Sequence, residues 1–252
     1  MALMAAGPRR SGVGTGELAS GWWCTRPCGS DQGREAQPGL LAGGPKLCEA
    51  VGLLRKEDPT WLNRCLADIA DDYDLIVIDS RPGIWQLQDA GACVAGFVLI
   101  PTKVDDASID GLAEVVDELT MIRERYNPST EILGVVLTLV ASRYVRVIAQ
   151  ARARLENLLG DSGVTVYEPV IRDTVVAGIE STRNKGRLAH EYEQVAANAP
   201  PWWKRLRKEA NDDEPVSKAA SGLAQDYQDL TDAVMVDFLQ RLQRRRELTH
   251  HG

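Results

Sequence analysis

Short apolar runs that alternate with stretches of helical periodicity are the feature that most constrains the fold of this chain. Three runs, Leu75 to Ile78, Gly96 to Ile100 and Ile132 to Val140, lack the polar alternation of a half-exposed strand. They therefore predict central strands that are covered on both faces. Strand and helix in steady alternation favour right-handed crossovers. The sequence thus predicts an α/β fold with a parallel sheet and flanking helices.

The stretches between and after these runs carry apolar residues at three- and four-residue steps, which predicts helices. Asp106 or Ser108 can cap the helix that reaches Tyr126. The other expected elements are helices from Trp61 to Ile69, from Val145 to Leu159 and from about Ser217, and a short strand from Val164 to Val166.

Composition and charge limit the classes of protein to which the chain can belong. The 252 residues are 44% hydrophobic, which is enough for one substantial core. The formal net charge of -7 excludes a protein that is basic over its whole surface, so any DNA contact requires a local patch. No apolar run approaches the ~18 residues of a membrane span, and the N-terminus lacks an apolar signal core. We therefore expect a cytoplasmic protein with no membrane partner.

The cysteines do not form a recognisable metal site. Cys24 and Cys28 have a C-x3-C spacing, but a second pair is missing and all three histidines lie far downstream. The ligand set of a structural zinc site is therefore incomplete. Reduced thiols, some of them buried, are expected in a cytosolic chain.

The first 46 residues differ in kind from those that follow. They are rich in Gly, Pro and Arg and contain no periodic apolar segment, so we predict disorder there and no family sequence. Residues 47–245 are expected to form one α/β domain, and residues 246–252 a tail. Within that domain, residues 196–215 interrupt the pattern with Pro, Trp and a basic cluster, which predicts a surface excursion.

Asp79 directly follows the first apolar run. In open α/β sheets ligands bind at the carboxyl ends of the strands, and an aspartate there commonly holds a hydrated magnesium ion beside nucleotide phosphates. An alternative is an Asp that merely caps a turn, for which the sequence Asp-Ser-Arg-Pro-Gly is also suitable. The strand and its aspartate alone leave both interpretations open.

Four segments, taken in order, resemble the ParA family of partition ATPases, which is related to MinD. They are YDLIVIDSRPG (73–83), GFVLIPTKVDDASIDGL (96–112), EILGVVLTLVASR (131–143) and YEPVIRDTVVAGIEST (167–182). The resemblance implies a P-loop NTPase-like fold, here N-terminally incomplete, with ATP and Mg²⁺ as cofactors. It further implies a role in chromosome or plasmid partitioning, a ParB-like centromere-binding partner and a homodimer. Non-specific DNA binding is also implied, and it would associate the protein with the nucleoid.

The resemblance also assigns residues, at the positions that match the family's segments. Asp79 is similar to the Walker B carboxylate, which is catalytic and holds Mg²⁺ through water. The expected nucleotide-binding residues lie in the switch II segment, at the end of the second strand and in two later loops; they are Ser80, Arg81, Pro82, Gly83, Pro101, Thr102, Thr138, Arg143, Arg172 and Asp173. Arg81 departs from the Asp-Thr-Pro-Pro common in the family. Ordinary loop chemistry is the alternative explanation for each of these positions.

The phosphate-binding half of such an ATPase is missing from the sequence. The family's P-loop cradles phosphates with backbone amides and two lysines, but neither G-K-S nor G-K-T occurs in this chain. The nearest segment, Arg10 to Ala19, has Thr15 where the phosphate lysine should be and Gly16 where the magnesium-binding hydroxyl should be. We therefore expect impaired ATP hydrolysis.

Other function classes remain as alternatives. A non-catalytic truncated paralogue could bind DNA or a partner through basic residues at 204–208, beside Trp202 and Trp203, and through Arg241 and 244–246. The simpler explanation of these charges is a solvated loop and helix end. A dehydrogenase is disfavoured because no G-x-G-x-x-G follows a strand, and a Ser-His-Asp enzyme because His190 is the only histidine outside the tail.

Overall fold

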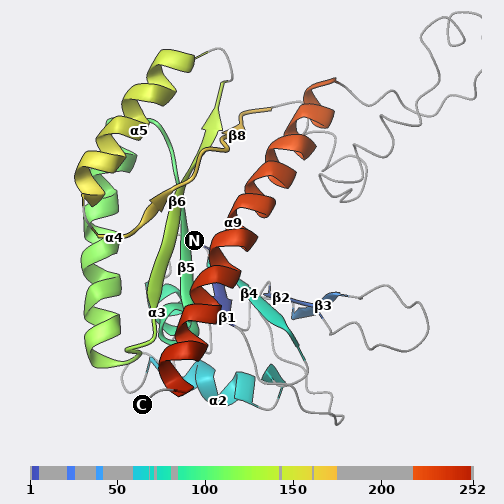
Figure 1. Cartoon of the computed structure of the whole chain (residues 1–252), viewed down its shortest axis with the longest axis vertical. Helices are drawn as coiled ribbons and strands as arrows, with labels where there is room; N and C mark the ends of the chain where they lie inside the picture. The colour runs from blue at the N-terminus through green and yellow to red at the C-terminus, as the bar shows by residue number, and fades with distance from the viewer. Residues whose placement is uncertain are drawn as a thin grey trace, which may run out of the picture. The chain divides into compact units, whose positions relative to one another are not determined.

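The computed structural model describes ten stretches of the chain, and Figure 1 labels most of their helices and strands. The described residues are 2–5, 22–25, 38–41, 59–67, 69–70, 73–80, 85–141, 144–160, 162–174 and 218–250. Contacts divide the chain into two compact units. The first comprises Met1–Pro101 and Asp110–Gly134, and the second comprises Thr102–Ile109 and Val135–Gly252.

The first unit is built around β4. Its elements, some of which continue into the second unit, are β1 (Ala2–Ala5), β2 (Trp22–Thr25), β3 (Pro38–Leu41), α2 (Trp61–Ala67), β4 (Leu75–Asp79), α3 (Trp85–Val94), β5 (Phe97–Thr102) and α4 (Asp106–Arg125). The strand order is β3-β2-β4-β1-β5. Because β1 runs antiparallel to both β4 and β5, those two strands share one direction. The added N-terminal strands β1 and β2 are antiparallel to the strands that they join.

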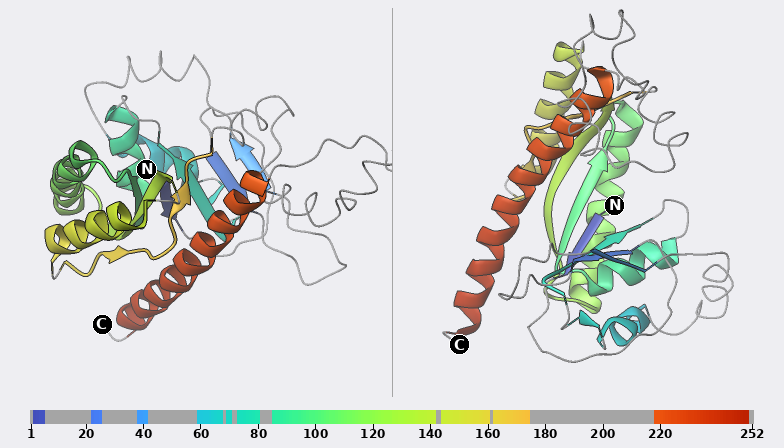
Figure 2. Two further views of the ribbon diagram at one scale, coloured as in Figure 1. Left: turned by 90° about the horizontal axis from the view of Figure 1, so that it is seen from above. Right: turned by 90° about the vertical axis from the view of Figure 1, so that its right-hand side faces the viewer.

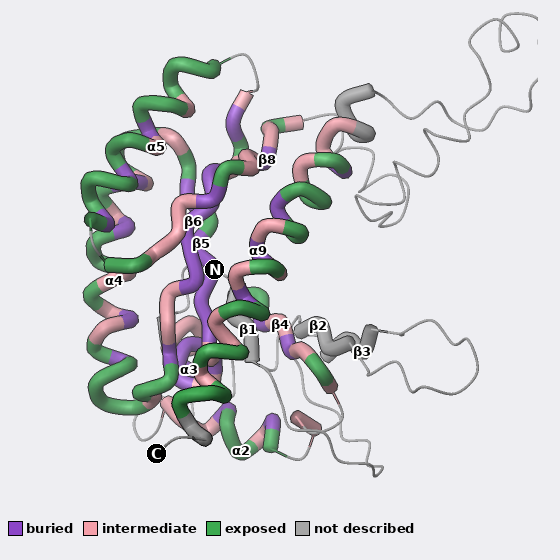
Figure 3. The backbone as a smooth tube through the Cα atoms, in the orientation of Figure 1, coloured by how far each residue is buried: buried purple, intermediate pink, exposed green. Residues whose placement is uncertain are grey.

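Burial explains why these residues form strands. Ile76 and Ile78 of β4 are 1% and 2% exposed, and the four residues Phe97 to Ile100 of β5 are all buried. Figure 3 shows the resulting buried stretch along β5. Removing such β-branched and aromatic side chains from water supplies most of the stabilisation of a sheet of this kind.

The start of α4 differs from the prediction. Asp105 is the capping residue, since its Oδ1 accepts a hydrogen bond from the Ser108 backbone N–H at 2.9 Å and its Oδ2 accepts one from the Ser108 hydroxyl at 3.0 Å. The prediction of Asp106 or Ser108 as the cap is wrong because the helix already begins at Asp106, so the capping position is the residue before it, and Asp105 accepts the free amide of the third helical residue. These bonds from Ser108 lower the pKa of the Asp105 carboxyl below its usual value.

The second unit contains the remaining elements. They are β6 (Glu131–Val140), which begins in the first unit, α5 (Val145–Leu159), β7 (Thr165–Val166), β8 (Ile171–Arg172) and α9 (Lys218–His250). β8 pairs in parallel with β6, and a bulge between Thr138 and Val140 shifts the register. Leu139, inside that bulge, has a φ of 57° and is 57% exposed.

α9 packs on this unit through one apolar stripe. Its buried residues recur at helical spacing: Ala224, Leu230, Val234 and Phe238. Figure 2 shows α9 as one uninterrupted helix, and its contacts with β8 place it beside that strand. Within the described residues, no helix is long and apolar enough to cross a membrane.

The predicted fold class is confirmed. The chain is α/β with flanking helices, and its parallel relationships include those of β4 with β5 and of β6 with β8. Three short strands fall within the first 46 residues, for which disorder was predicted; the rest of that segment lies outside the described residues. The 47–245 domain boundaries stay a prediction.

Candidate functional site

The carboxyl end of β4 places Asp79 and Ser80 in different environments. Side chains alternate along a strand, so Ser80 continues the buried positions of Ile76 and Ile78, whereas Asp79 is exposed. Ser80 is only 4% exposed. The Asp79 carboxylate is therefore accessible at the end of the strand where a hydrated metal ion was expected. Its catalytic role stays a prediction.

Four of the predicted nucleotide-binding residues cannot be placed. Arg81, Pro82, Gly83 and Arg143 lie outside the described residues. Pro101 is described in the first unit, where it is an exposed residue of β5 that directly follows buried Ile100.

Thr102 and Thr138 use their hydroxyl groups inside the second unit. The Thr138 hydroxyl donates to the Thr102 carbonyl at 3.2 Å, and the Thr102 hydroxyl donates to the Ser108 carbonyl at 3.2 Å. Thr102 is buried. These two side chains therefore connect β6, the end of β5 and the first turn of α4.

Arg172 forms an ion pair with α9. Its Nε and Nη2 donate to the two carboxylate oxygens of Asp226 at 2.6 and 2.7 Å, and its backbone N–H also donates to Asp226 at 3.0 Å. Such bidentate, charge-assisted bonds are among the strong hydrogen bonds of proteins. The neighbouring Asp173 donates its backbone N–H to the Val140 carbonyl at 2.9 Å, and its side chain is exposed.

These positions fit a magnesium nucleotide only in part. The exposed Asp79 carboxylate suits a hydrated Mg²⁺, since hard cations prefer oxygen ligands and Mg²⁺ keeps several waters. The polar side chains of Thr102, Thr138 and Arg172 already have protein partners. The sequence offers no G-K-S or G-K-T loop for phosphates. The described residues therefore offer a hydrated metal ion one carboxylate, that of Asp79, and they do not suit the triphosphate.

A cavity of about 390 Å³ lies in the first unit, next to Ser80. Its polar lining is Ser80, Gln88, Asp89 and Glu118, and its apolar lining is Ala92, Ile100, Pro101, Val115, Leu119 and Ile122. Two buried oxygens in it, Ser80 Oγ and Asp89 Oδ1, have no hydrogen-bond partner within the described part of the chain. Burial, together with the hydrogen bond and the negative charge of Glu118, raises the pKa of Asp89 from its ordinary value of 3.8 to about 7. Sequence reasoning identified Ser80 and Pro101 but missed the two carboxyl groups.

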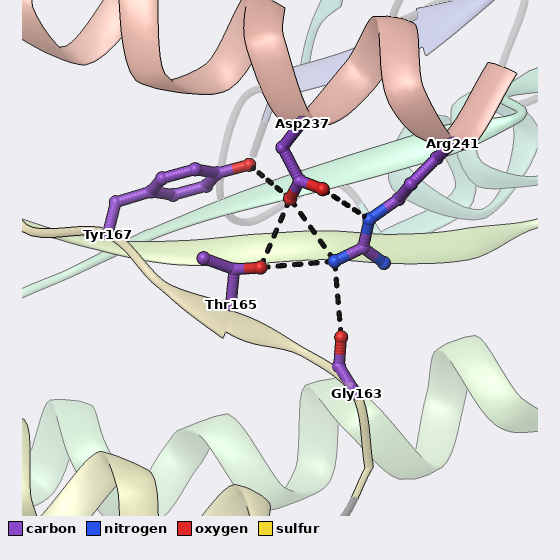
Figure 4. A network of polar contacts seen from close by, with 5 residues as sticks. All are labelled: Gly163, Thr165, Tyr167, Asp237 and Arg241. Atoms are coloured by element: carbon purple, nitrogen blue, oxygen red, sulfur yellow. Dashed lines mark hydrogen bonds and ion pairs between the residues drawn. The ribbon is translucent and has the colours of Figure 1, made fainter. Parts of the chain in front are cut away.

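A second polar cluster fastens α9 to β7 in the second unit (Figure 4). Asp237 accepts hydrogen bonds from the Tyr167 hydroxyl at 3.0 Å, the Thr165 hydroxyl at 3.1 Å and Arg241 Nε at 2.8 Å. Arg241 Nη2 also donates to the Gly163 carbonyl at 3.1 Å. Burial opposes ionisation of Asp237, but these donors and the charge of Arg241 hold its pKa below the usual value. Arg241 was proposed as a DNA contact; its side chain is 10% exposed and serves this cluster.

Comparisons with known proteins agree with the resemblance seen in the sequence. Residues 39–132 match the AAA domain family, a range that contains β4, α3, β5 and α4. An uncharacterized protein of Mycobacterium tuberculosis is 33% identical over 114 residues, which are 45% of this chain and 35% of that protein. The chromosome-partitioning ATPase Soj of Thermus thermophilus is 30% identical over 117 residues, which are 45% of this chain and 46% of that protein.

Among solved structures, cobyrinic acid a,c-diamide synthase from Mycobacterium smegmatis with bound ADP and magnesium is similar. The TM-score is 0.46 at 22% identity, and the match covers 60% of this chain and 65% of that one. The match to the Thermus and the M. tuberculosis proteins spans less than half of the length of either relative.

Proposed function

The chain is ParA/MinD-like, and from that premise we propose that it acts in DNA partitioning as a nucleotide-responsive protein with impaired ATP hydrolysis. The observation that carries this proposal is the exposed carboxylate of Asp79 at the end of β4, within the matched AAA domain. A strand that ends in an accessible aspartate at the carboxyl edge of the sheet is the arrangement that positions Mg²⁺ beside a nucleotide.

Impaired hydrolysis follows from the chemistry of phosphoryl transfer. Electrostatic stabilisation of the transferring group is the main contribution of such enzymes, and lysines of the P-loop supply much of it. This chain has no G-K-S or G-K-T segment, and Arg172 is paired with Asp226. Nucleotide binding through Mg²⁺ at Asp79 is then weak, and turnover is slow or absent.

The partners proposed here come from the family and not from the geometry. They are a ParB-like centromere-binding protein, a second copy of the chain and non-specific DNA. The relative from Thermus thermophilus is named a chromosome-partitioning ATPase, which supports the partitioning role.

A phosphate-release assay on the full chain tests the proposal. We expect ATP, Mg²⁺ and protein together to release no more phosphate than the Asp79→Ala variant does. A parallel titration with a fluorescent ATP analogue should show weak Mg²⁺-dependent binding that Asp79→Ala abolishes. Asp74→Ala is the matched control, because it removes a carboxylate from the opposite end of the same strand region and should leave binding unchanged. Phosphate release well above that of the Asp79→Ala variant would refute impaired hydrolysis. Binding of the ATP analogue that is equally tight in the parent protein and in Asp79→Ala would refute the nucleotide site.

A second candidate, a non-catalytic DNA-binding module, is favoured by exposed arginines late in α9. Arg244 and Arg246 are both exposed, whereas the 204–208 cluster lies outside the described residues. If these arginines contact phosphates, the affinity for DNA should fall steeply with salt. Arg244→Glu with Arg246→Glu should weaken binding for all sequences alike. Arg123→Glu with Arg125→Glu, at the end of α4, is the charge-matched control; equal losses in both double variants would reject the arginines of α9 as the site.

A further inference from the structure

The cavity next to Ser80 in the first unit has a composition that the nucleotide proposal does not explain. Two carboxyl groups face it, Asp89 from α3 and Glu118 from α4. A triphosphate would be repelled by this pair. The carboxyl groups of the cavity therefore favour a positively charged ligand.

Two buried polar groups that have no protein partner in the described part of the chain are available to a molecule that enters the cavity. Ser80 is 4% exposed, and neither its Oγ nor Asp89 Oδ1 has a hydrogen-bond partner among the described residues. Buried polar atoms in proteins are nearly always paired with protein, water or ligand. Both of these residues line the cavity, so a group bound there can satisfy the two oxygens together.

We propose that this cavity binds an organic cation, namely an ammonium or guanidinium group carried on an aliphatic stem. The carboxyl pair and the Ser80 hydroxyl accept hydrogen bonds from the N–H groups, and Gln88 offers an amide oxygen. The stem packs on the apolar wall, which includes Ile100, Leu119 and Ile122. The volume of about 390 Å³ falls within the range of roughly 300–1,000 Å³ that is typical of small-molecule sites.

The aliphatic wall distinguishes this ligand from a bare metal ion. Metal sites need several oxygen, nitrogen or sulfur ligands, and no group of three or more His, Cys, Asp or Glu side chains converges within the described residues. An amphipathic cation instead uses both parts of the lining, in the way that Lys and Arg side chains bury an apolar stem and keep a charged head paired.

Binding must be coupled to proton release. Asp89 has a pKa of about 7, and Glu118 is the only other ionisable side chain among the described lining residues. At lower pH Asp89 holds a proton, and the cation displaces that proton to solvent when it binds. Affinity therefore rises as the pH is raised toward and above 7.

Calorimetry on the full chain, without nucleotide, tests this site independently of the proposed ATP chemistry. Butylguanidinium is the probe, and butylurea is the uncharged control of nearly the same shape. We expect butylguanidinium to bind with a Kd on the order of 1 mM at pH 7.5, and butylurea to give no binding. Binding should be about tenfold weaker at pH 5.5 than at pH 7.5.

Neutral variants of the carboxyl groups localise the binding. Asp89→Asn and Glu118→Gln should each weaken binding about tenfold or more, with unchanged circular dichroism. Asp117→Asn removes the same charge from an exposed position on α4 and should have no effect. The proposal would be overturned if Asp117→Asn lost as much affinity for butylguanidinium as the other two variants, or if butylurea bound. It would also be overturned if Mg²⁺ bound and butylguanidinium did not.

A blocked Gly-Arg-Gly peptide distinguishes the two sources of such a cation. Binding at least as tight as that of butylguanidinium supports an arginine side chain of a partner protein as the natural occupant. Binding of butylguanidinium but not of the peptide supports a free small molecule. Failure of both probes to bind overturns the site and leaves the nucleotide proposal untouched.

Discussion

Replacing Asp89 by asparagine should make the protein more stable at pH 8 and leave its stability nearly unchanged near pH 4. Burial and Glu118 raise the pKa of Asp89 from 3.8 to about 7 in the folded chain. Between these values the native state holds one more proton than the unfolded state, so the free energy of unfolding falls as the pH rises. The contribution of neutral Asp89 is fully present below the unfolded pKa and is lost once the pH exceeds about 7. Asparagine keeps the shape and stays neutral, so the variant escapes this loss.

The magnitude follows from the shift and the exposure. Each pKa unit corresponds to about 1.4 kcal/mol, so a shift of this size sets an upper limit of roughly 4 kcal/mol. Asp89 is half-buried, and solvent screening reduces the expected gain at pH 8 to about 1–2 kcal/mol.

Urea unfolding at pH 5, 6, 7 and 8 measures the effect. The difference in free energy of unfolding between Asp89→Asn and the parent protein should grow from pH 5 to pH 7 and then level off. Asp117→Asn, on the exposed side of α4, should show no such trend. A difference that is flat across this range, or an Asp89→Asn variant that is less stable at pH 8, would refute the reasoning.

Three further predictions concern the second unit and a helical glycine outside it, each measured by urea unfolding. A Cβ on Gly222 would clash with the Arg172 guanidinium, so Gly222→Ala should cost about 1 kcal/mol. Gly111→Ala, with open space around it, should instead gain about 0.5–1 kcal/mol, and equal effects of the two substitutions would contradict the packing of Arg172. Asp237→Asn should cost about 2 kcal/mol at pH 7, and because the pKa of Asp237 is lowered, this difference should disappear as the pH falls through that pKa; a pH-independent loss would argue against ionisation as its source. Leu139, with a φ of 57°, should gain about 0.5–1 kcal/mol on replacement by glycine, and a loss would show that the left-handed backbone is not strained.

The elements that sequence periodicity predicted are those with a strong apolar pattern. The helix from Val145 to Leu159 was predicted with its observed bounds, because buried Ala151, Leu155 and Leu159 recur at four-residue steps. The strand β4 and its terminal aspartate were likewise recognisable, since an unbroken β-branched run fits few other structures.

The helix α3 was missed for the opposite reason. Its buried face is made largely of small residues, Ala90, Ala92 and Cys93, which give little helical contrast in hydrophobicity. Thr130 contributes to its C-terminal end, since its buried hydroxyl donates to the carbonyls of Ala92 and Ala95 at 3.1 Å. A bond across such a separation in sequence cannot be inferred from local pattern.

The residues of the candidate sites likewise differ in how far a local sequence pattern predicts them. Asp79 was predicted because its position at a strand end is a local property. The pairing of Asp89 with Glu118 and that of Arg172 with Asp226 depend on which helix packs against which strand or helix. These pairs are set by tertiary packing, and no spacing in the sequence predicts them.

The ion pair between Arg172 and Asp226 also has a consequence for biosynthesis. Strand β8 is two residues long, and the Asp226 carboxylate that binds its Arg172 lies 54 residues further along the chain. During translation Arg172 of this strand has no ion-pair partner until α9 has emerged from the ribosome, because a contact between two distant residues forms only after the second residue has been synthesised. Until then the edge of β6 that receives β8 is open to other strands, and stalled chains ending before residue 226 should be the ones most prone to aggregate.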